Sequence, residues 1–399
     1  MMTKRSLQVL VALTVSSAAT YAATENVIQF QNHVRIGYDD NIYQNSTDED
    51  SAFITEIINL SANLTFSSRT DALLYWEPEF RYRFDADPEF VTYQNLYAKL
   101  NHALTERAFL TLSDRLFYRQ MDGQSGGVDD SNQNYFENDL NGAVNYTLND
   151  ISFLTLGAGY SFRIWDDSDY GEWQDGAETG GNDFNEFNAD FSYYRQIKPN
   201  KTQAMAGIDY SNLEYDGSRG GFDSLSLIVG VDQTFNPQVT AFGRVGYSMS
   251  TIDQVNGSED TSAPYFKAGV EVSPSEKTQV SGSLGYSLSR SENSAYNAQD
   301  RFDIGVSVRR DLTAKIALTG ALNYILSNYD GSYSANYGAD LPDVDDALII
   351  FSLRCAYQLN RNNFVEAGYL FRTRDLSGGL DDNSDWDGNR VDLAWRLRL

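Results

Sequence analysis

Residues 389–399 of the chain read NRVDLAWRLRL, an alternation of apolar and mostly charged side chains. Because successive side chains of a β-strand point to opposite faces, this stretch has one apolar and one polar face. The apolar face holds Val391, Leu393, Trp395, Leu397 and Leu399, and the other holds Arg390, Asp392, Ala394, Arg396 and Arg398. In a bilayer such a strand needs only lipid on one side and a water-filled lumen on the other. The stretch therefore predicts a strand of a transmembrane β-barrel.

The same alternation recurs along the chain in runs of roughly ten to fourteen residues, the length that a tilted membrane strand requires. The segments assigned one direction are 27–38, 72–84, 108–119, 151–164, 201–215, 238–252, 277–290, 314–328 and 362–374. Those assigned the opposite direction are 53–66, 89–103, 135–147, 183–196, 222–235, 263–273, 297–310, 345–359 and 389–399. We therefore expect an all-β fold: a transmembrane antiparallel up-and-down β-barrel of about 18 strands, with 16–20 allowed. Residues 23–399 would form this single domain.

The connections between these segments alternate in length. Short ones lie at 67–71, 149–150, 198–200, 236–237, 274–276 and 360–361. Mostly long, polar and acidic ones lie at 39–52, 120–134, 165–182, 253–262, 329–344 and 375–388. Long loops at one end and tight turns at the other are typical of an outer-membrane barrel, with the short turns and both termini in the periplasm.

A tyrosine recurs once in each segment of the first direction, late in the segment. The set is Tyr38, Tyr82, Tyr118, Tyr160, Tyr210, Tyr247, Tyr286, Tyr324 and Tyr369. Phenol rings at one height form an interfacial girdle, with the ring toward lipid and the hydroxyl toward head groups. A tyrosine-rich soluble sheet would explain the tyrosine content but not the recurring position.

If the tyrosines face lipid, the opposite parity must face the lumen, and it is indeed polar in most segments. In segment 277–290, for example, serines alternate with Val280, Leu284 and Tyr286. Segment 108–119 fits worst, because Asp114 shares a face with its leucines and Tyr118. A bulge or a misjudged register in this segment is the hypothesis for that aspartate.

Residues 1–22 read as a secretory signal peptide. Lys4 and Arg5 precede a short apolar core, and small residues surround the expected cleavage site after Ala22. Removing these residues changes the formal net charge from −26 to −28, because two cations are lost. Such acidity argues against a nucleic-acid partner. The one cysteine, Cys355, excludes an intramolecular disulfide framework, and no apolar run is long enough for a membrane helix.

Nine arginines are candidates for lining the pore. They are Arg35, Arg301, Arg309, Arg354, Arg372, Arg374, Arg390, Arg396 and Arg398. Most belong to the last three segments and the first, which become neighbours once a barrel closes. They predict a path for anionic or sugar solutes, since guanidinium groups suit carboxylates and phosphates. The alternative is an ion-pair network with Glu366, Asp303 and Asp392 that merely fills the lumen.

Catalytic, metal and cofactor sites have weak support in the sequence. The chain has two histidines, His33 and His102, which lie far apart, so we expect no enzyme and no cofactor. Asn383, Asp385 and Asp387, followed by Gly388, partly match the start of a calcium loop. A solvated acidic loop is the alternative, although calcium or magnesium could bind diffusely at acidic extracellular loops.

The mature chain resembles the outer-membrane β-barrel porins grouped as putative beta-barrel porin 2. The resemblance lies in the signal peptide, the Gly-Tyr repeats, the Asn-Pro and Asn-Asp turns and the amphipathic terminal strand. That last strand is also similar to the C-terminal strand by which Gram-negative barrels are recognised, although it ends in Leu399 where they end in Phe or Trp. The resemblance implies a bacterial outer-membrane location, lipid contact and docking on the barrel-assembly machinery.

Two functions remain open from the sequence. The first is a passive diffusion pore for small polar or anionic/sugar solutes, because about 18 strands enclose a lumen too wide for side chains to fill. The second is a non-conducting barrel that serves as a surface scaffold, an adhesin or an exopolysaccharide-export partner. Its lumen would be blocked by inward loops, for which residues 166–182 are long enough. The oligomeric state is unknown.

Overall fold

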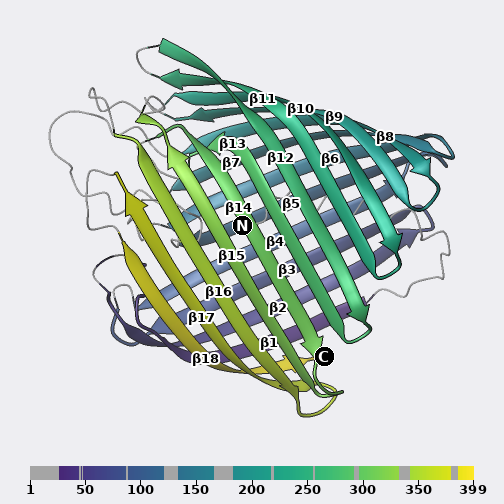
Figure 1. Cartoon of the computed structure of the whole chain (residues 1–399). Coiled ribbons are helices and arrows are strands. Elements are labelled where there is room, and N and C mark those ends of the chain that lie inside the picture. The colour runs from purple at the N-terminus through teal and green to yellow at the C-terminus, as the bar shows by residue number, and fades with distance from the viewer. Residues whose placement is uncertain are drawn as a thin grey trace.

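The computed structural model describes residues 27–399 except 45, 47, 87–88, 121–133, 166–182, 217–219, 255–256, 292–295, 332–341 and 379–384. Eighteen strands form one closed antiparallel sheet in which each strand pairs with its neighbours in sequence (Figure 1). The strands are β1 (Val27–Asp39), β2 (Ser51–Ser67), β3 (Thr70–Arg83), β4 (Phe90–Ala103), β5 (Ala108–Gln120), β6 (Asn134–Asn149), β7 (Ser152–Trp165), β8 (Phe184–Lys198), β9 (Thr202–Tyr215), β10 (Gly221–Asn236), β11 (Val239–Gln254), β12 (Gly257–Ser275), β13 (Thr278–Arg290), β14 (Ala298–Asp311), β15 (Ile316–Tyr329), β16 (Val344–Gln358), β17 (Asn363–Ser377) and β18 (Trp386–Arg398). The predicted up-and-down barrel of 18 strands is confirmed.

The barrel closes by pairing β18 with β1. Trp395 is opposite Val34 and Val391 is opposite Tyr38 in this ladder. The ladder extends to the last residue, since Leu399 N donates to Phe30 O at 2.8 Å. Closure removes the unpaired edges that an open sheet would expose. Among the described residues, no helix is long and apolar enough to cross a membrane.

Strand alternation sets the two faces of the wall. On β18, the side chain of Leu393 is 57% exposed on the outside, whereas its neighbour Ala394 is 5% exposed on the inside. Large exposed apolar side chains recur in this way on every strand except β13, whose outward apolar side chains are half-buried. This pattern is the reverse of a soluble barrel, whose apolar side chains fill the interior.

The short turns are shaped by side chains that bond to their own backbone. Asn149 Oδ1 accepts from Ile151 N at 3.0 Å, and Asn236 Oδ1 accepts from Gln238 N at 2.8 Å. Asn360 Oδ1 accepts from Asn362 N at 3.0 Å. An asparagine carbonyl that accepts from the residue two positions later stabilises a tight turn. These turns lie at the barrel end where β1 begins and β18 finishes (Figure 1).

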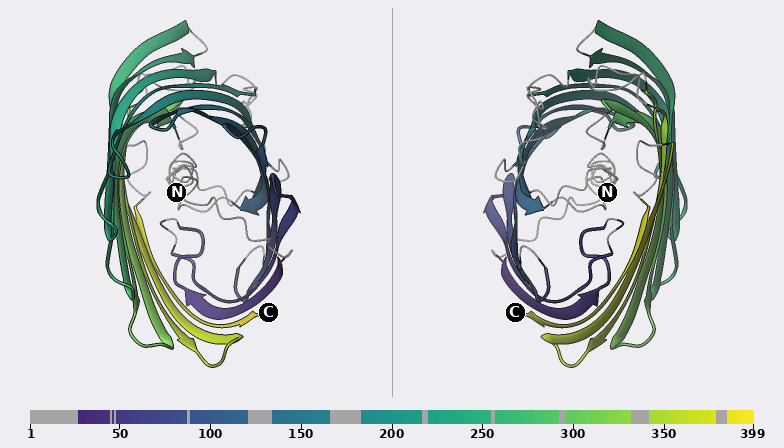
Figure 2. Two further views of the ribbon diagram at one scale, coloured as in Figure 1. Left: turned by 90° about the vertical axis from the view of Figure 1, so that its right-hand side faces the viewer. Right: turned by 90° about the vertical axis from the view of Figure 1, so that its left-hand side faces the viewer.

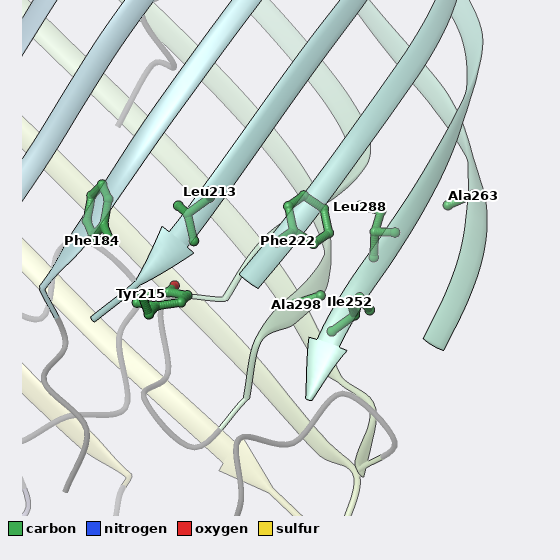
Figure 3. Close-up of a cluster of buried hydrophobic side chains, with 8 residues drawn as sticks. All are labelled: Phe184, Leu213, Tyr215, Phe222, Ile252, Ala263, Leu288 and Ala298. Carbon is green, nitrogen blue, oxygen red and sulfur yellow. The ribbon is translucent and has the colours of Figure 1, made fainter. Parts of the chain in front are cut away.

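The long-loop end contains a small apolar core. Pairing between β12 and β13 stops at Phe266 and Tyr286. Beyond that point Leu288 packs in one buried cluster with Ile252 and Ala263 (Figure 3). The other members of the cluster are Phe184, Leu213, Tyr215, Phe222 and Ala298. The cluster extends from β8 to β14 and therefore bridges the place where β12 and β13 are no longer paired.

Two expectations about individual segments are wrong. Residues 253–262 are not a long loop, because β11 continues to Gln254 and β12 begins at Gly257. The bulge or shifted register proposed for Asp114 is absent, since β5 pairs with β4 and β6 in an unbroken register. Asp114 is exposed on the outer face and accepts a hydrogen bond from Asn138 Nδ2 at 2.7 Å. The signal peptide and residues 166–182 lie outside the described residues.

Candidate lumen-wall site

The nine predicted arginines differ in where they lie on the wall. Six of them lie on the inner face of adjacent strands β16, β17, β18 and β1, namely Arg35, Arg354, Arg372, Arg374, Arg390 and Arg396. The other three do not join them. Arg301 is on the inner face of β14, Arg398 is exposed at the short-turn end, and Arg309 is 62% exposed with Asp311 at 3.8 Å.

Three of these six arginines, Arg35, Arg354 and Arg396, form an ion-pair cluster with Glu366 and Asp392. Arg354 lies 3.1 Å from Asp392 and 3.4 Å from Glu366. Arg396 lies 2.8 Å from Glu366, and Arg35 lies 3.9 Å from Asp392. A Cβ on Gly368 would come within 2.8 Å of Arg354 and 2.7 Å of Asp392, so the pair crosses over this glycine. Here the arginines are largely neutralised by carboxylates.

A second group surrounds a cavity of about 280 Å³ at the long-loop end of the lumen. We call it the arginine pocket. Its charged lining consists of six arginines, Arg81, Arg83, Arg115, Arg119, Arg372 and Arg390, against three carboxylates, Asp39, Glu77 and Glu79. Phe53, Tyr93 and Phe117 supply aromatic rings to the same lining. The pocket therefore has an excess of positive charge.

The carboxylates of the pocket are already engaged. Arg372 Nη2 donates to Asp39 at 3.1 and 3.2 Å, and Arg81 lies 2.7 Å from Glu79. Glu77 accepts from Asn59 Nδ2 at 2.9 Å. None of the three therefore forms an ion pair within 4.0 Å with the other pocket arginines among the described residues.

Three arginines in this pocket lack a carboxylate partner within the described chain. Arg83 is 5% exposed, and its Nη1 makes no hydrogen bond. The Nε atoms of Arg115 and Arg390 are likewise buried without a partner. Arg83 and Arg115 instead pack over the rings of Tyr43 and Tyr97, at 5.8 and 5.3 Å from the ring centroids. The Nε atoms of Arg35 and Arg396 in the cluster are also buried without a hydrogen bond. The feature that points to an anion in the pocket is therefore the lack of a carboxylate near these buried guanidinium groups, which is unfavourable.

The loop between β1 and β2 forms one side of this pocket. Its residues Ile42, Tyr43 and Gln44 line the cavity together with wall residues of β3 and β5. Figure 2 shows this segment, which follows β1, inside the ring of strands. The loop therefore narrows the lumen.

Hydrogen bonds to β18 hold the loop in place. Asp40 accepts from Asn389 N at 2.5 Å and from Asn389 Nδ2 at 2.9 Å. Asn41, which is fully buried, donates to Asp387 O at 3.0 Å and to Asp48 at 3.0 Å. These residues are about as far apart in the chain as two residues can be, so the closed barrel is required to bring them together.

Sequence reasoning missed the arginines of β3 and β5. Arg81 and Arg83 flank the outward Tyr82 in the sequence, and Arg119 follows Tyr118. The parity that places those tyrosines outside places these arginines inside. The same rule that found the arginines of β16, β17, β18 and β1 would have found them.

The nine recurring tyrosines lie on the outer face, late in their strands. Seven of the hydroxyl groups form a hydrogen bond near the long-loop end. In each case the partner belongs to the following strand or to the loop that precedes it. Tyr160, for example, donates to Asn185 at 2.6 Å, and Tyr369 donates to Asn389 at 2.7 Å. Their contact with a lipid interface stays a prediction.

The calcium and catalytic candidates do not form sites in the described part of the chain. Asn383 lies outside it, and Asp385 accepts from Leu376 N at 2.6 Å. No group of three or more metal-ligating side chains occurs among the described residues. His33 lies on the inner face 3.7 Å from Glu366, whereas His102 bonds Thr70 at 2.8 Å near a short turn.

Comparison with known proteins gives a family match over part of the chain and many similar folds. Residues 223–399 match the family described as "Putative beta-barrel porin 2". A search of curated proteins found no match. The structure of OpdK from Pseudomonas aeruginosa with vanillate is similar at TM-score 0.51 and 13% identity, covering 93% of this chain and 99% of that one.

A receptor is similar to the same degree. The ferric enterobactin receptor PfeA from Pseudomonas aeruginosa matches at TM-score 0.51 and 8% identity, covering 95% of this chain and 81% of that one. Likeness at such identities extends to the fold alone. Together with the family match over residues 223–399, the closed 18-stranded barrel supports a porin-like barrel similar to those of the outer membrane.

Proposed function

We propose that the protein is a passive diffusion pore in the bacterial outer membrane for small polar solutes. Anionic solutes are preferred, and sugars are candidates among the neutral ones. The observation that carries this proposal is the arginine pocket, in which Arg83, Arg115 and Arg390 have no carboxylate partner in the described chain. No catalytic role is part of the proposal.

The physical argument concerns charge at a narrow place. A solute that crosses the lumen along this part of the wall meets the pocket, where Ile42, Tyr43 and Gln44 approach β3 and β5. Fixed guanidinium groups without counter-charges attract anions there, and the low-dielectric wall strengthens that attraction. The chain as a whole is strongly acidic, so the local excess of positive charge is a property of this site. OpdK, which is similar in fold, has been crystallised with vanillate, an organic anion. This supports testing anions first.

The decisive experiment is conductance in a planar bilayer under a salt gradient. Stable conductance steps with a reversal potential on the anion side support the proposal, and persistent silence of folded protein contradicts it. The variant Arg83→Gln with Arg390→Gln should move the reversal potential toward cations. The control is Arg309→Gln, which removes an arginine exposed at the short-turn end. An equal shift in the control would mean that selectivity does not arise in the pocket.

A second function is favoured by one observation, the attachment of the inward loop to β18. A barrel closed by this loop would be a non-conducting surface scaffold, an adhesin or an exopolysaccharide-export partner. Asp40→Ala with Asn41→Ala removes the side-chain bonds to Asn389 and Asp387. If the native protein is silent and this variant conducts, the closed barrel is the native form. If both conduct, with larger steps in the variant, the loop only narrows an open pore.

Assembly partners follow from the same proposal. We expect outer-membrane lipid around the wall and recognition of β18 by the barrel-assembly machinery, because β18 must pair with β1 to close the sheet. Leu397→Glu places a charge on the outward face of β18. It should leave synthesis and export intact and abolish insertion, measured as loss of the heat-modifiable folded band in outer-membrane fractions.

A further inference from the structure

The outer face of β1–β6 carries acidic side chains where the rest of the wall is apolar. Glu56 on β2 and Asp114 on β5 are exposed there, on the same faces as Ile54 and Leu112. Among the described strands, they are the two charged outward side chains that lie more than four residues from either end of a strand. Lipid-facing charge away from the strand ends is unfavourable, so these residues need a reason.

Both carboxylates lie well inside the apolar band. Asp114 is four residues below Tyr118 along β5, and Glu56 is opposite Val34, four residues below Tyr38. At about 3.3 Å per residue and a tilt of about 40°, this places them about 10 Å below the tyrosines, in a band about 25 Å tall. Lipid head groups do not reach this depth.

Each carboxylate is bonded to an amide on a neighbouring strand. Asn32 Nδ2 donates to Glu56 Oε1 at 2.7 Å, and Asn138 Nδ2 donates to Asp114 Oδ1 at 2.7 Å. Gln94 lies on β4 between the two pairs, and its Oε1 accepts from Trp76 Nε1 at 3.1 Å. These five residues form the polar row: Asn32, Glu56, Gln94, Asp114 and Asn138.

The polar row is incomplete within one copy of the chain. The second oxygen of each carboxylate has no hydrogen bond in the described structure. The amide nitrogen of Gln94 makes none either, although it carries two donors. Hydrocarbon supplies neither donors nor acceptors, so these groups are unsatisfied against lipid. The matching outward positions of β7 to β18 below the tyrosines are apolar, alanine or glycine.

We propose that the polar row is the contact surface with a second copy of this chain in the membrane, related by a two-fold axis. A two-fold interface requires one patch that carries both donors and acceptors, and here the free amide of Gln94 is flanked by the free oxygens of Glu56 and Asp114. Across the axis, Gln94 of each copy donates to a carboxylate of the other. The inference uses the proposed membrane location and is independent of conduction.

Cysteine cross-linking in outer membranes tests the contact. In a Cys355→Ser background, Gln94→Cys should form a disulfide-linked species of twice the chain mass. The matched control is Val229→Cys, which is outward and 55% exposed on β10, in the apolar sector. Cross-linking at Gln94→Cys and not at Val229→Cys supports the contact. Equal cross-linking at both positions, none at either, or a band containing another protein or three copies would overturn it.

A second measurement guards against failure of the cysteine variants to fold. Native mass spectrometry in detergent should show a dimer, and Glu56→Leu with Asp114→Leu should lower the association constant about tenfold or more, because charge-assisted bonds between copies are lost. The folded, heat-modifiable barrel should persist, since both changes extend the apolar belt. A monomeric native protein, or an unchanged association constant, contradicts the proposal. Conductance of either form is a separate outcome, which tests the pore proposal alone.

Discussion

The ion-pair cluster and the arginine pocket use the same side chain in opposite ways. In the cluster, Arg354 and Arg396 lie within 3.4 Å of Glu366 or Asp392. In the pocket, Arg83 and Arg390 have no carboxylate within 4.0 Å among the described residues, although they too are on the inner wall. Both regions include residues of strand β18, namely Arg390 in the pocket and Asp392 and Arg396 in the cluster.

The difference shows that an arginine-lined wall is not uniform in charge. Paired arginines stabilise the wall at the cost of desolvation, and they leave little net field in the lumen. Unpaired arginines destabilise the empty protein and keep their field for a passing solute. Removing a carboxylate from the cluster is therefore expected to lower the unfolding free energy. Adding a carboxylate to the pocket is expected to raise it.

The largest effect should come from removing the carboxylates of the cluster. Glu366→Gln with Asp392→Asn leaves Arg35, Arg354 and Arg396 without counter-charges. Breaking a fully buried ion pair costs about 3–5 kcal/mol of unfolding free energy. Because Arg354 and Arg396 are 33% and 31% exposed, solvent lowers the cost here, and we expect a total loss at or below that range. Urea unfolding in detergent micelles measures it, and anion preference in bilayers should rise in the same variant.

A small loss of unfolding free energy in this double variant would contradict the contrast between cluster and pocket. If the double variant unfolds at nearly the native urea concentration, the cluster is solvated by lumen water. The arginines of the cluster and of the pocket would then be alike in their energetics.

A smaller and opposite effect is expected from adding a carboxylate to the pocket. Asn95 lines the cavity, and its Oδ1 is buried without a hydrogen bond. Asn95→Asp keeps the shape of the side chain and places a negative charge in the cavity that Arg115 also lines. We expect a gain of about 1 kcal/mol in unfolding free energy, because a charged hydrogen bond replaces an unsatisfied atom, and a loss of anion preference in bilayers.

This variant has its own control on strand β16. Gln358→Glu adds the same charge on β16 near the short turns, outside the pocket lining. It should change the reversal potential less than Asn95→Asp. A destabilised Asn95→Asp protein would mean that Glu77 and Glu79, which line the same cavity, dominate the local charge.

The barrel itself was predictable because its rules are local. Strand parity, tyrosine position and turn residues such as Asn149 and Asn236 are each read within one hairpin. The strand number and the adjacency of β18 to β1 follow from counting and closure. The start of β12 was misplaced, at 263 instead of Gly257, because polar residues continue the strand beyond the apolar part, where alternation no longer indicates pairing.

The division between cluster and pocket was not predictable from the same rules. Parity places Arg354 and Arg83 on one inner wall, but whether a carboxylate lies within reach depends on diagonal neighbours across several strands. The inward loop depends on bonds between Asp40 and Asn389, at opposite ends of the chain. Such contacts exist only after closure, so no local pattern encodes them.

The smallest effect should come from the third environment, an exposed arginine with an exposed partner. Arg309 and Asp311 lie 3.8 Å apart and are 62% and 43% exposed at the short-turn end. Exposed pairs of this kind contribute about 0–1 kcal/mol, because water screens them. Asp311→Asn should therefore leave the urea midpoint almost unchanged, and added salt should not alter the difference. A loss of unfolding free energy comparable to that of Glu366→Gln would show that ion pairing stabilises the wall whether the pair is buried or exposed. The contrast between cluster and pocket would then not depend on burial.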